Sequence, residues 1–177
     1  MVDRLNPIPK PSFTFQSCLS RSSILPISLA APLTRSPTGQ IQKFQLFGAG
    51  VYTIWHNDGR FIYVGMSGPG ITAETSRRNT PQGIYTRLQS HASGRRSGDQ
   101  FCVYVADRLV LPTLSQDDTT AIASGRHQMD AFVRRYIHEN LCYRFVMLPD
   151  GAAAYALEAA IKLGEWTHGR PFLNPGR

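Results

Sequence analysis

Apolar residues recur with two different periods along this chain, and each period predicts a different kind of element. Short runs of aromatic and β-branched residues, or strict alternation of apolar and polar residues, are typical of strands. Such segments occur at Gly50–Trp55, Phe61–Met66, Phe101–Ala106 and Tyr143–Leu148. We therefore expect four strands in the part of the chain that begins near Phe44.

Helical spacing of apolar residues predicts three helices between and after these strands. The predicted helices cover residues 82 to 92, residues 129–141 and an alanine-rich segment at 152–164. Gly94 is suited to end the first of them as a C-terminal glycine. Two stretches that are rich in small and polar residues, 67–82 and about 107–127, are predicted to be loops.

The first two predicted strands flank Asn57-Asp58-Gly59-Arg60, which is typical of a β-hairpin turn. A two-residue loop would place Tyr52 opposite Gly65 and Ile54 opposite Tyr63. The two tyrosines would then share one face, roughly 7–8 Å apart as diagonal neighbours. A four-residue loop preserves this arrangement, whereas a three-residue loop puts the tyrosines on opposite faces. Two such tyrosines are either a packed cross-strand pair or a candidate chemical site beside a glycine.

Residues 1–43 differ from the rest, because they are rich in proline and serine and have no sustained periodicity. We expect a flexible, disordered and basic N-terminal arm, followed by one globular domain at 44–177. The arm is either an ordinary leader or a segment that follows a nucleic-acid backbone.

The whole chain of 177 residues has 19 Lys and Arg against 12 Asp and Glu, a formal net charge of +7. This excess favours a polyanionic partner, either nucleic acid or an anionic membrane surface. No run of 18 apolar residues is present, so a membrane span is not expected. The widely spaced Cys18, Cys102 and Cys142 form neither a disulfide framework nor a zinc-spaced pair, which suits a cytoplasmic location.

Two further positions combine residue types that can carry chemistry. Arg87 and His91 are four residues apart on one predicted helix, so they share a face and could both contact a phosphate. The alternative is a pair of solvated residues. Glu158 lies at the edge of the buried stripe of the last helix, where a carboxylate could hold a hard divalent cation. The alternative is an ordinary surface pair with Lys162 at i,i+4.

Taken in order, these features resemble the GIY-YIG nuclease family over about Gly48 to Pro175. The resemblance rests on the following residues: Gly50-Val51-Tyr52, Tyr63-Val64-Gly65, Arg87, His91, Glu158 and Asn174 before Pro175. The literal string Gly83-Ile84-Tyr85 is not part of the match, because it opens a helix. The spacing of Arg87 and His91, after a long loop, is most similar to the type II restriction endonucleases of the family.

The resemblance implies an α+β fold, with a small, mostly antiparallel β-sheet flanked by helices. It also implies hydrolysis of DNA phosphodiester bonds assisted by Mg²⁺ or Mn²⁺. Glu158 would bind the metal, Arg87 would brace the phosphate, and Tyr52 would take a proton from the attacking water. His91 would accept or relay that proton.

The remaining two residues of the motif have supporting roles. Tyr63 would position the water or the phosphate. Asn174 would orient Tyr52, Glu158 or the substrate; as an alternative, its Asn-Pro sequence simply ends a loop.

DNA binding is expected from basic residues on either side of the Arg87 helix, namely Arg77, Arg78, Arg95 and Arg96. The expected partner is double-stranded DNA, and cutting both strands with one site per chain favours a homodimer. Two alternatives are a repair, recombination or mobile-element nuclease on the same scaffold, and a non-catalytic nucleic-acid-binding module.

Overall fold

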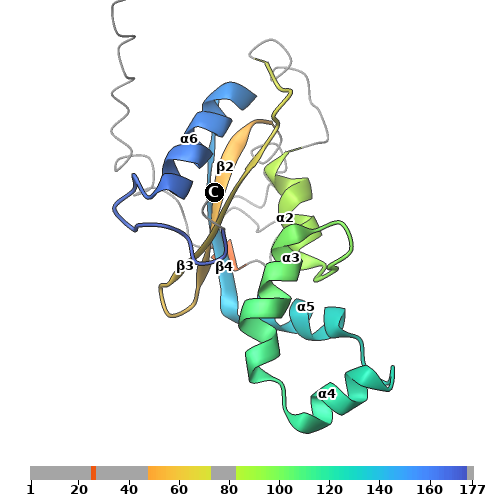
Figure 1. Ribbon diagram of the computed structural model, residues 1–177. Helices are drawn as coiled ribbons and strands as arrows, with labels where there is room; N and C mark the ends of the chain where they lie inside the picture. The colour runs from red at the N-terminus through yellow and green to blue at the C-terminus, as the bar shows by residue number, and fades with distance from the viewer. Residues whose placement is uncertain (1–24, 27–47, 73–82, 175–177) are drawn as a thin grey trace, which may run out of the picture.

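The computed structural model describes residues 25–26, 48–72 and 83–174 (Figure 1). One antiparallel sheet contains four strands in the order β1 (Leu25–Pro26), β4 (Leu141–Met147), β2 (Gly50–His56) and β3 (Phe61–Ser67). One side of the sheet is covered by α2 (Ile84–Ala92), α3 (Gln100–Val105) and α5 (Met129–Asn140), and the other by α6 (Gly151–Leu163) (Figure 1). The expected α+β fold, a small antiparallel sheet flanked by helices, is confirmed.

Six of the elements occupy the segments that the sequence predicts, with ends that differ by two residues at most: β2, β3, β4, α2, α5 and α6. Of the predicted arm at 1–43, only Leu25 and Pro26 are described, and they pair with Tyr143 and Cys142 of β4. The rest of that arm lies outside the described residues. Among the described helices, none is long and apolar enough to cross a membrane.

The segment predicted as a strand at Phe101–Ala106 is helical, so that prediction is wrong. The residues that it buries recur in adjacent pairs four residues apart, as on one face of a helix: Phe101, Cys102, Val105, Ala106, Leu109 and Val110. The helix α3 continues through a π-helical turn at Ala106–Val110 into a 3₁₀ turn at Leu111–Thr113. A six-residue window is too short to distinguish this pattern from alternation.

The predicted loop at about 107–127 also contains a helix, α4 (Gln116–Ala123). Ser115 and Asp118 begin this helix with a capping box, in which each side chain bonds to the other residue's backbone N–H. A Ser followed three residues later by Asp is a local sequence signal for the start of a helix, and the loop prediction overlooked it.

The β2–β3 turn differs from the predicted two-residue loop. His56 donates its backbone N–H to the Arg60 carbonyl at 2.9 Å, so Asn57, Asp58 and Gly59 form a three-residue loop. Gly59 has a positive φ of 91°, which this type of hairpin requires at its last loop position.

A three-residue loop alone would place the two tyrosines on opposite faces. The register shifts between Ile54 and Trp55, because Ile54 pairs with Tyr63 and Trp55 pairs with Phe61, which leaves Ile62 as an extra residue. This β-bulge compensates for the odd loop length. The predicted opposition of Tyr52 to Gly65 is therefore confirmed, although the predicted loop length is wrong.

Side chains of β2 alternate between the two faces of the sheet, so they contribute to two separate hydrophobic cores. Tyr52 and Ile54 pack with α2, α3 and α5. Val51 and Trp55 pack on the opposite face with Ala154 and Ile161 of α6. The central strand is thus buried on both sides, and it fixes the positions of helices that are far apart in the sequence.

The C-terminal segment covers the exposed edge of β3. Phe172 and Leu173 donate their backbone N–H groups to the carbonyls of Phe61 and Ile62, at 3.1 and 2.8 Å. The Arg108 guanidinium donates to the Phe172 carbonyl at 2.6 Å and stacks over the Phe172 ring. The edge strand is therefore paired rather than open to another chain.

Two glycines in the α2–α3 connection provide a matched test of the packing between α2 and α5. Gly94 and Gly98 both have positive φ, at 71° and 81°. A Cβ on Gly94 would lie 2.5 Å from the Arg134 backbone nitrogen, whereas a Cβ on Gly98 would meet nothing within 4 Å. We expect Gly98→Ala to lower the free energy of unfolding by about 1–2 kcal/mol, the cost of the left-handed conformation alone. Gly94→Ala should cost clearly more in urea denaturation, and equal losses would contradict the described packing.

Candidate active site

The two hairpin tyrosines share one face of the sheet, as predicted. Their ring centroids are 6.4 Å apart, and Tyr52 is only 2% exposed. The Tyr52 ring crosses over Gly65, where an added Cβ would collide with the phenol oxygen and lie 2.5 Å from the carbon that bears it. Gly65 is therefore required sterically, because any side chain there would displace Tyr52.

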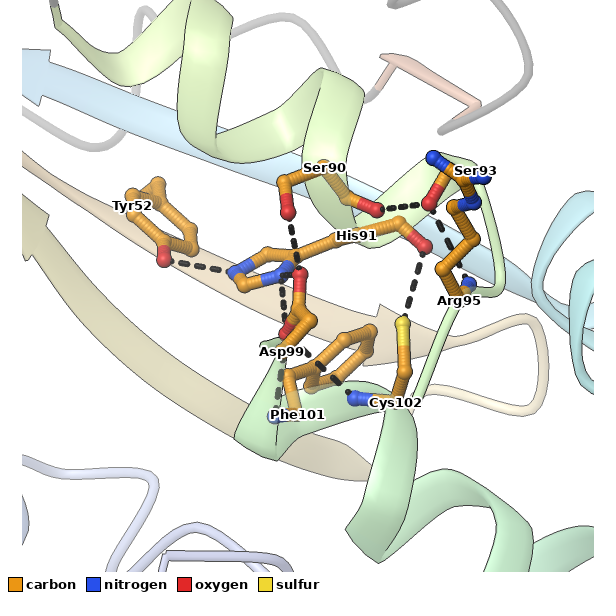
Figure 2. A network of polar contacts seen from close by, with 8 residues as sticks. All are labelled: Tyr52, Ser90, His91, Ser93, Arg95, Asp99, Phe101 and Cys102. Carbon is orange, nitrogen blue, oxygen red and sulfur yellow. Dashed lines mark hydrogen bonds and ion pairs between the residues drawn. The ribbon is translucent and has the colours of Figure 1, made fainter. Parts of the chain in front are cut away.

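The buried hydroxyl of Tyr52 lies at one end of a chain of polar contacts (Figure 2). Its oxygen is 2.7 Å from Nε2 of His91, and Nδ1 of His91 is 2.8 Å from Oδ2 of Asp99. His91 is 5% exposed and Asp99 is 7% exposed. Three titratable side chains from β2, α2 and the start of α3 thus form one connected, buried unit.

Asp99 was not identified from the sequence. Ser90 donates its hydroxyl to Oδ2 of Asp99 at 2.7 Å, and Phe101 and Cys102 donate their backbone N–H groups to Oδ1 at 3.1 and 3.4 Å. Asp99 is therefore also the N-cap of α3. An Asp directly before apolar residues at helical spacing is a local signal for an N-cap. The prediction of a strand at Phe101–Ala106 prevented Asp99 from being recognised as one.

Burial and neighbouring charges hold both phenols in the neutral form. Desolvation raises the pKa of Tyr52 well above its usual value, Tyr63, Asp99 and Glu158 raise it further, and Arg87 opposes the shift. Desolvation together with the charges of Glu158 and Asp99 raises the pKa of Tyr63 to about 12, again against Arg87. Neither phenol is ionised at neutral pH, so the Tyr52 hydroxyl keeps its hydrogen and can donate to His91 or accept from it, depending on the tautomer of the ring.

Arg87 and Glu158 approach the two tyrosines from different helices. Arg87 is exposed on α2, one turn before His91, whereas the Glu158 side chain on α6 is 12% exposed. The charges of both residues act on the pKa values of Tyr52 and Tyr63. Arg87 and Glu158 are therefore each within electrostatic range of the two tyrosines, although the four residues come from three separate parts of the chain.

Glu158 also forms the ion pair that the sequence left open as an alternative. Its Oε1 lies 3.0 Å from Nζ of Lys162, at i,i+4. In the described part of the chain, no group of three or more His, Cys, Asp or Glu side chains could hold a metal ion. A single carboxylate is nevertheless compatible with Mg²⁺, which commonly takes one or two protein carboxylates and retains several waters.

The described hydrogen bonds of Asn174 go to the backbone of β3. Its Oδ1 accepts from the Val64 N–H at 2.8 Å, and its Nδ2 donates to the Val64 carbonyl at 3.0 Å. The amide therefore behaves like a backbone peptide on the edge of β3, and its described hydrogen bonds go to neither Tyr52 nor Glu158. Val64 is the residue between Tyr63 and Gly65, so Asn174 fixes the backbone of the second motif.

The predicted DNA-binding arginines divide into three groups. Arg77 and Arg78 lie outside the described residues. Arg96 pairs with Asp130 of α5 at 2.7 Å, and Arg95 is exposed beside it. Arg95 lines a surface groove of about 710 Å³ together with Arg134, Arg135 and His138, and also with Asp130 and Glu139. The groove therefore mixes both signs of charge.

No protein-family model, curated protein or solved structure matches this chain.

Because the pKa values of Tyr52 and Tyr63 are raised, the stability of the folded chain should fall at alkaline pH. An unfolded tyrosine ionises near pH 10, whereas Tyr52 and Tyr63 stay neutral to higher pH in the folded chain. Their contribution to the free energy of unfolding should be fully present below about pH 10 and be lost as the pH rises towards 12 and beyond. Denaturant titrations between pH 8 and 12 measure this slope.

Tyr63→Phe should make that decline shallower, because it removes one phenol whose pKa is raised. Tyr155→Phe is the matched control, since Tyr155 is 67% exposed on α6. An unchanged slope in Tyr63→Phe would contradict the burial of a neutral phenol at this position.

Proposed function

We propose that this protein is a divalent-metal-dependent endonuclease that hydrolyses DNA phosphodiester bonds. The single observation that carries the proposal is the contact of a buried phenol with a histidine, Tyr52 to His91, within the electrostatic reach of Arg87 and Glu158. A proton acceptor, a cation and a carboxylate around the same tyrosines would suit phosphodiester hydrolysis. The ordered GIY-YIG-like motif residues support the same reaction.

Arg87 is suited to the phosphate. Its guanidinium is exposed on α2, and it offers forked donors to the non-bridging oxygens. As negative charge grows on these oxygens in the transition state, the fixed positive charge of Arg87 stabilises it. Because Arg87 lies one turn before His91, a phosphate held by Arg87 would lie near the proton acceptor.

Tyr52 and His91 are suited to the proton transfer. A phenol whose pKa lies well above its usual value does not remove a proton from water by itself. As the Tyr52 oxygen takes a proton from the attacking water, its own proton passes to Nε2 of His91 at 2.7 Å. Tyr63, which is less buried than Tyr52, is available to position the water or a phosphate oxygen.

Glu158 would hold the Mg²⁺ or Mn²⁺ ion. When bound, such an ion neutralises charge on the scissile phosphate and on the leaving oxygen. Glu158 would then exchange its contact with Lys162 for the ion. An i,i+4 pair of this kind contributes only about 0.2–0.5 kcal/mol to a helix, so the exchange is inexpensive in free energy.

A sequence-specific restriction endonuclease is the favoured form of this activity, because Arg87-x3-His91 most resembles the type II members. The partner would be double-stranded DNA, and two copies of the chain would cut its two strands. A cytoplasmic location is compatible with the free thiols of Cys102 and Cys142. A non-catalytic nucleic-acid-binding module is the competing function, and it would bind DNA without nicking it under any divalent ion.

Digestion of a defined plasmid tests the activity directly. With Mg²⁺ or Mn²⁺ and no other cofactor, we expect a limited set of discrete fragments from supercoiled and from linearised DNA. The fragment ends identify the recognition sequence. A smear would favour a repair or mobile-element nuclease over a restriction enzyme, and DNA that stays intact while it is bound would reject catalysis.

Glu158→Gln tests the proposed metal ligand. A bound metal stabilises the transition state by several kcal/mol, so its loss should lower the cleavage rate by more than about 100-fold. Binding of DNA in an EDTA-containing gel should be preserved. Lys162→Met is the matched control, because it removes the same ion pair and keeps the carboxylate. Equal losses in the two variants would assign Glu158 a structural role instead.

A further inference from the structure

We infer that Asp99 is a positioning residue that fixes the tautomer of His91, so that the proton-accepting nitrogen of the ring faces Tyr52. The chemical consequence of this inference rests on the proposed nuclease function, whereas the tautomer itself can be measured without it. Asp99 lies outside the motif residues that resemble the GIY-YIG family, and no other role described above explains its contact with His91.

The chemistry of the two partners assigns the proton positions. Desolvation raises the pKa of Asp99, but hydrogen bonds from His91, Ser90 and the Cys102 N–H outweigh it, with the attraction of His91 whenever that ring is protonated, and lower the pKa overall. Asp99 is therefore an ionised carboxylate, which can only accept hydrogen bonds. Both carboxylate oxygens lie within 3.0 Å of Nδ1 of His91, so Nδ1 must carry a hydrogen. In the neutral form of the ring, this leaves a free lone pair at Nε2, 2.7 Å from the Tyr52 oxygen.

The carboxylate of Asp99 is itself held in one orientation. The Ser90 hydroxyl and the backbone N–H groups of Phe101 and Cys102 bind its two oxygens from separate elements. The Phe101 ring also packs on the imidazole, with centroids 4.6 Å apart (Figure 2). Neither the carboxylate nor the imidazole can rotate without breaking buried hydrogen bonds, and such bonds are costly to lose.

This arrangement also stabilises the product of the proton transfer. When the Tyr52 proton moves to Nε2, His91 becomes an imidazolium that still donates its Nδ1 hydrogen to Asp99. The proton stays on the ring, and Asp99 remains ionised and compensates the new charge. A neutral acceptor at position 99 would leave that charge uncompensated in a buried site.

Several other charged or titratable groups surround the unit and have to be considered in any pH experiment. They are Tyr63 on β3, Arg87 on α2, Cys102 and Tyr104 on α3, His138 on α5 and Glu158 on α6. His138 contacts the backbone carbonyl of Ala92 at 2.8 Å. Among the described contacts, Asp99 is the one carboxylate that hydrogen-bonds the His91 ring.

Asp99→Asn is the informative substitution, because Asn is as good an N-cap as Asp and should keep α3 in place. The amide can donate to Nδ1 of His91, which moves the ring hydrogen to Nε2 and places it against the Tyr52 hydroxyl. We expect the cleavage rate constant kcat to fall by about 10³–10⁴-fold with little change in KM for DNA, as in other histidines that lose an orienting carboxylate. The pH–rate profile should differ from that of the wild type, because the carboxylate no longer compensates the charged form of His91.

Asp118→Asn is the matched control. Asp118 completes the capping box at the start of α4 together with the N-cap Ser115, but it has no described contact with His91. It should keep the wild-type pH–rate profile. Identical profiles for Asp99→Asn and wild type would overturn the inference and leave Asp99 only the capping role.

The tautomer is read directly from the ¹⁵N chemical shifts of the imidazole nitrogens in the full-length protein without DNA. The chain has 5 His, and His91→Gln identifies which signals belong to His91. We expect a protonated Nδ1 and an unprotonated Nε2 in the wild type, and the reverse or a mixture in Asp99→Asn. A wild-type ring that carries its hydrogen on Nε2 would overturn the inference, whatever the activity.

Two further outcomes separate this inference from the proposed function. If Asp99→Asn fails to fold, Ser90→Ala removes one of the donors that hold Asp99 and should shift the same ¹⁵N signals in the same direction; unchanged signals would overturn the inference. If the wild type cuts no DNA but shows the expected tautomer and its reversal, the nuclease proposal fails and the assignment of Asp99 as the residue that sets the tautomer stands.

Discussion

The register between β2 and β3 is the constraint on which the rest of the candidate site depends. Side chains alternate between the two faces of a strand, so a slip of one residue would move Tyr52 from one core to the other. The three-residue loop alone would place the two tyrosines on opposite faces. The extra residue Ile62 shifts the register by one more residue and returns them to the same face. The Asn174 amide then holds the Val64 backbone, which stabilises the part of β3 that faces Tyr52.

Burial of the Tyr52 hydroxyl has consequences for its neighbours. A buried polar group without a partner costs about 1–3 kcal/mol, and the contact with His91 meets that need. His91 in turn needs an acceptor for Nδ1, which Asp99 provides, and Asp99 is satisfied by Ser90 and by the start of α3. One buried hydroxyl thus links a central strand to two helices, and each group orients the next.

The distribution of charge changes how the basic composition is interpreted. Eight of the 19 Lys and Arg lie outside the described residues, as do two of the 12 Asp and Glu. The described residues therefore hold 11 basic and 10 acidic side chains, which leaves them almost neutral. The net positive charge is concentrated in segments such as 1–24, 27–47 and 73–82. The proposed DNA contact thus depends on Arg87 at the site and on basic residues of those segments more than on a uniformly basic domain.

The sequence determined most of the secondary structure and the shared helix face of Arg87 and His91, because these features follow from local periodicity. The pairing of Tyr52 with Gly65 was predicted correctly from a wrong loop length, and the bulge at Ile62 is what restores it. The prediction failed at Phe101–Ala106, where six residues fit both periods and where the N-cap Asp99 and packing in the core with residues of α2 and α5 favour a helix. The tertiary structure alone decided that Asp99 meets His91, that Asn174 bonds to Val64, and that Glu158 and Arg87 act on the same phenols. Contacts between distant segments depend on how the helices and the C-terminal segment pack on the sheet, and no local pattern encodes that packing.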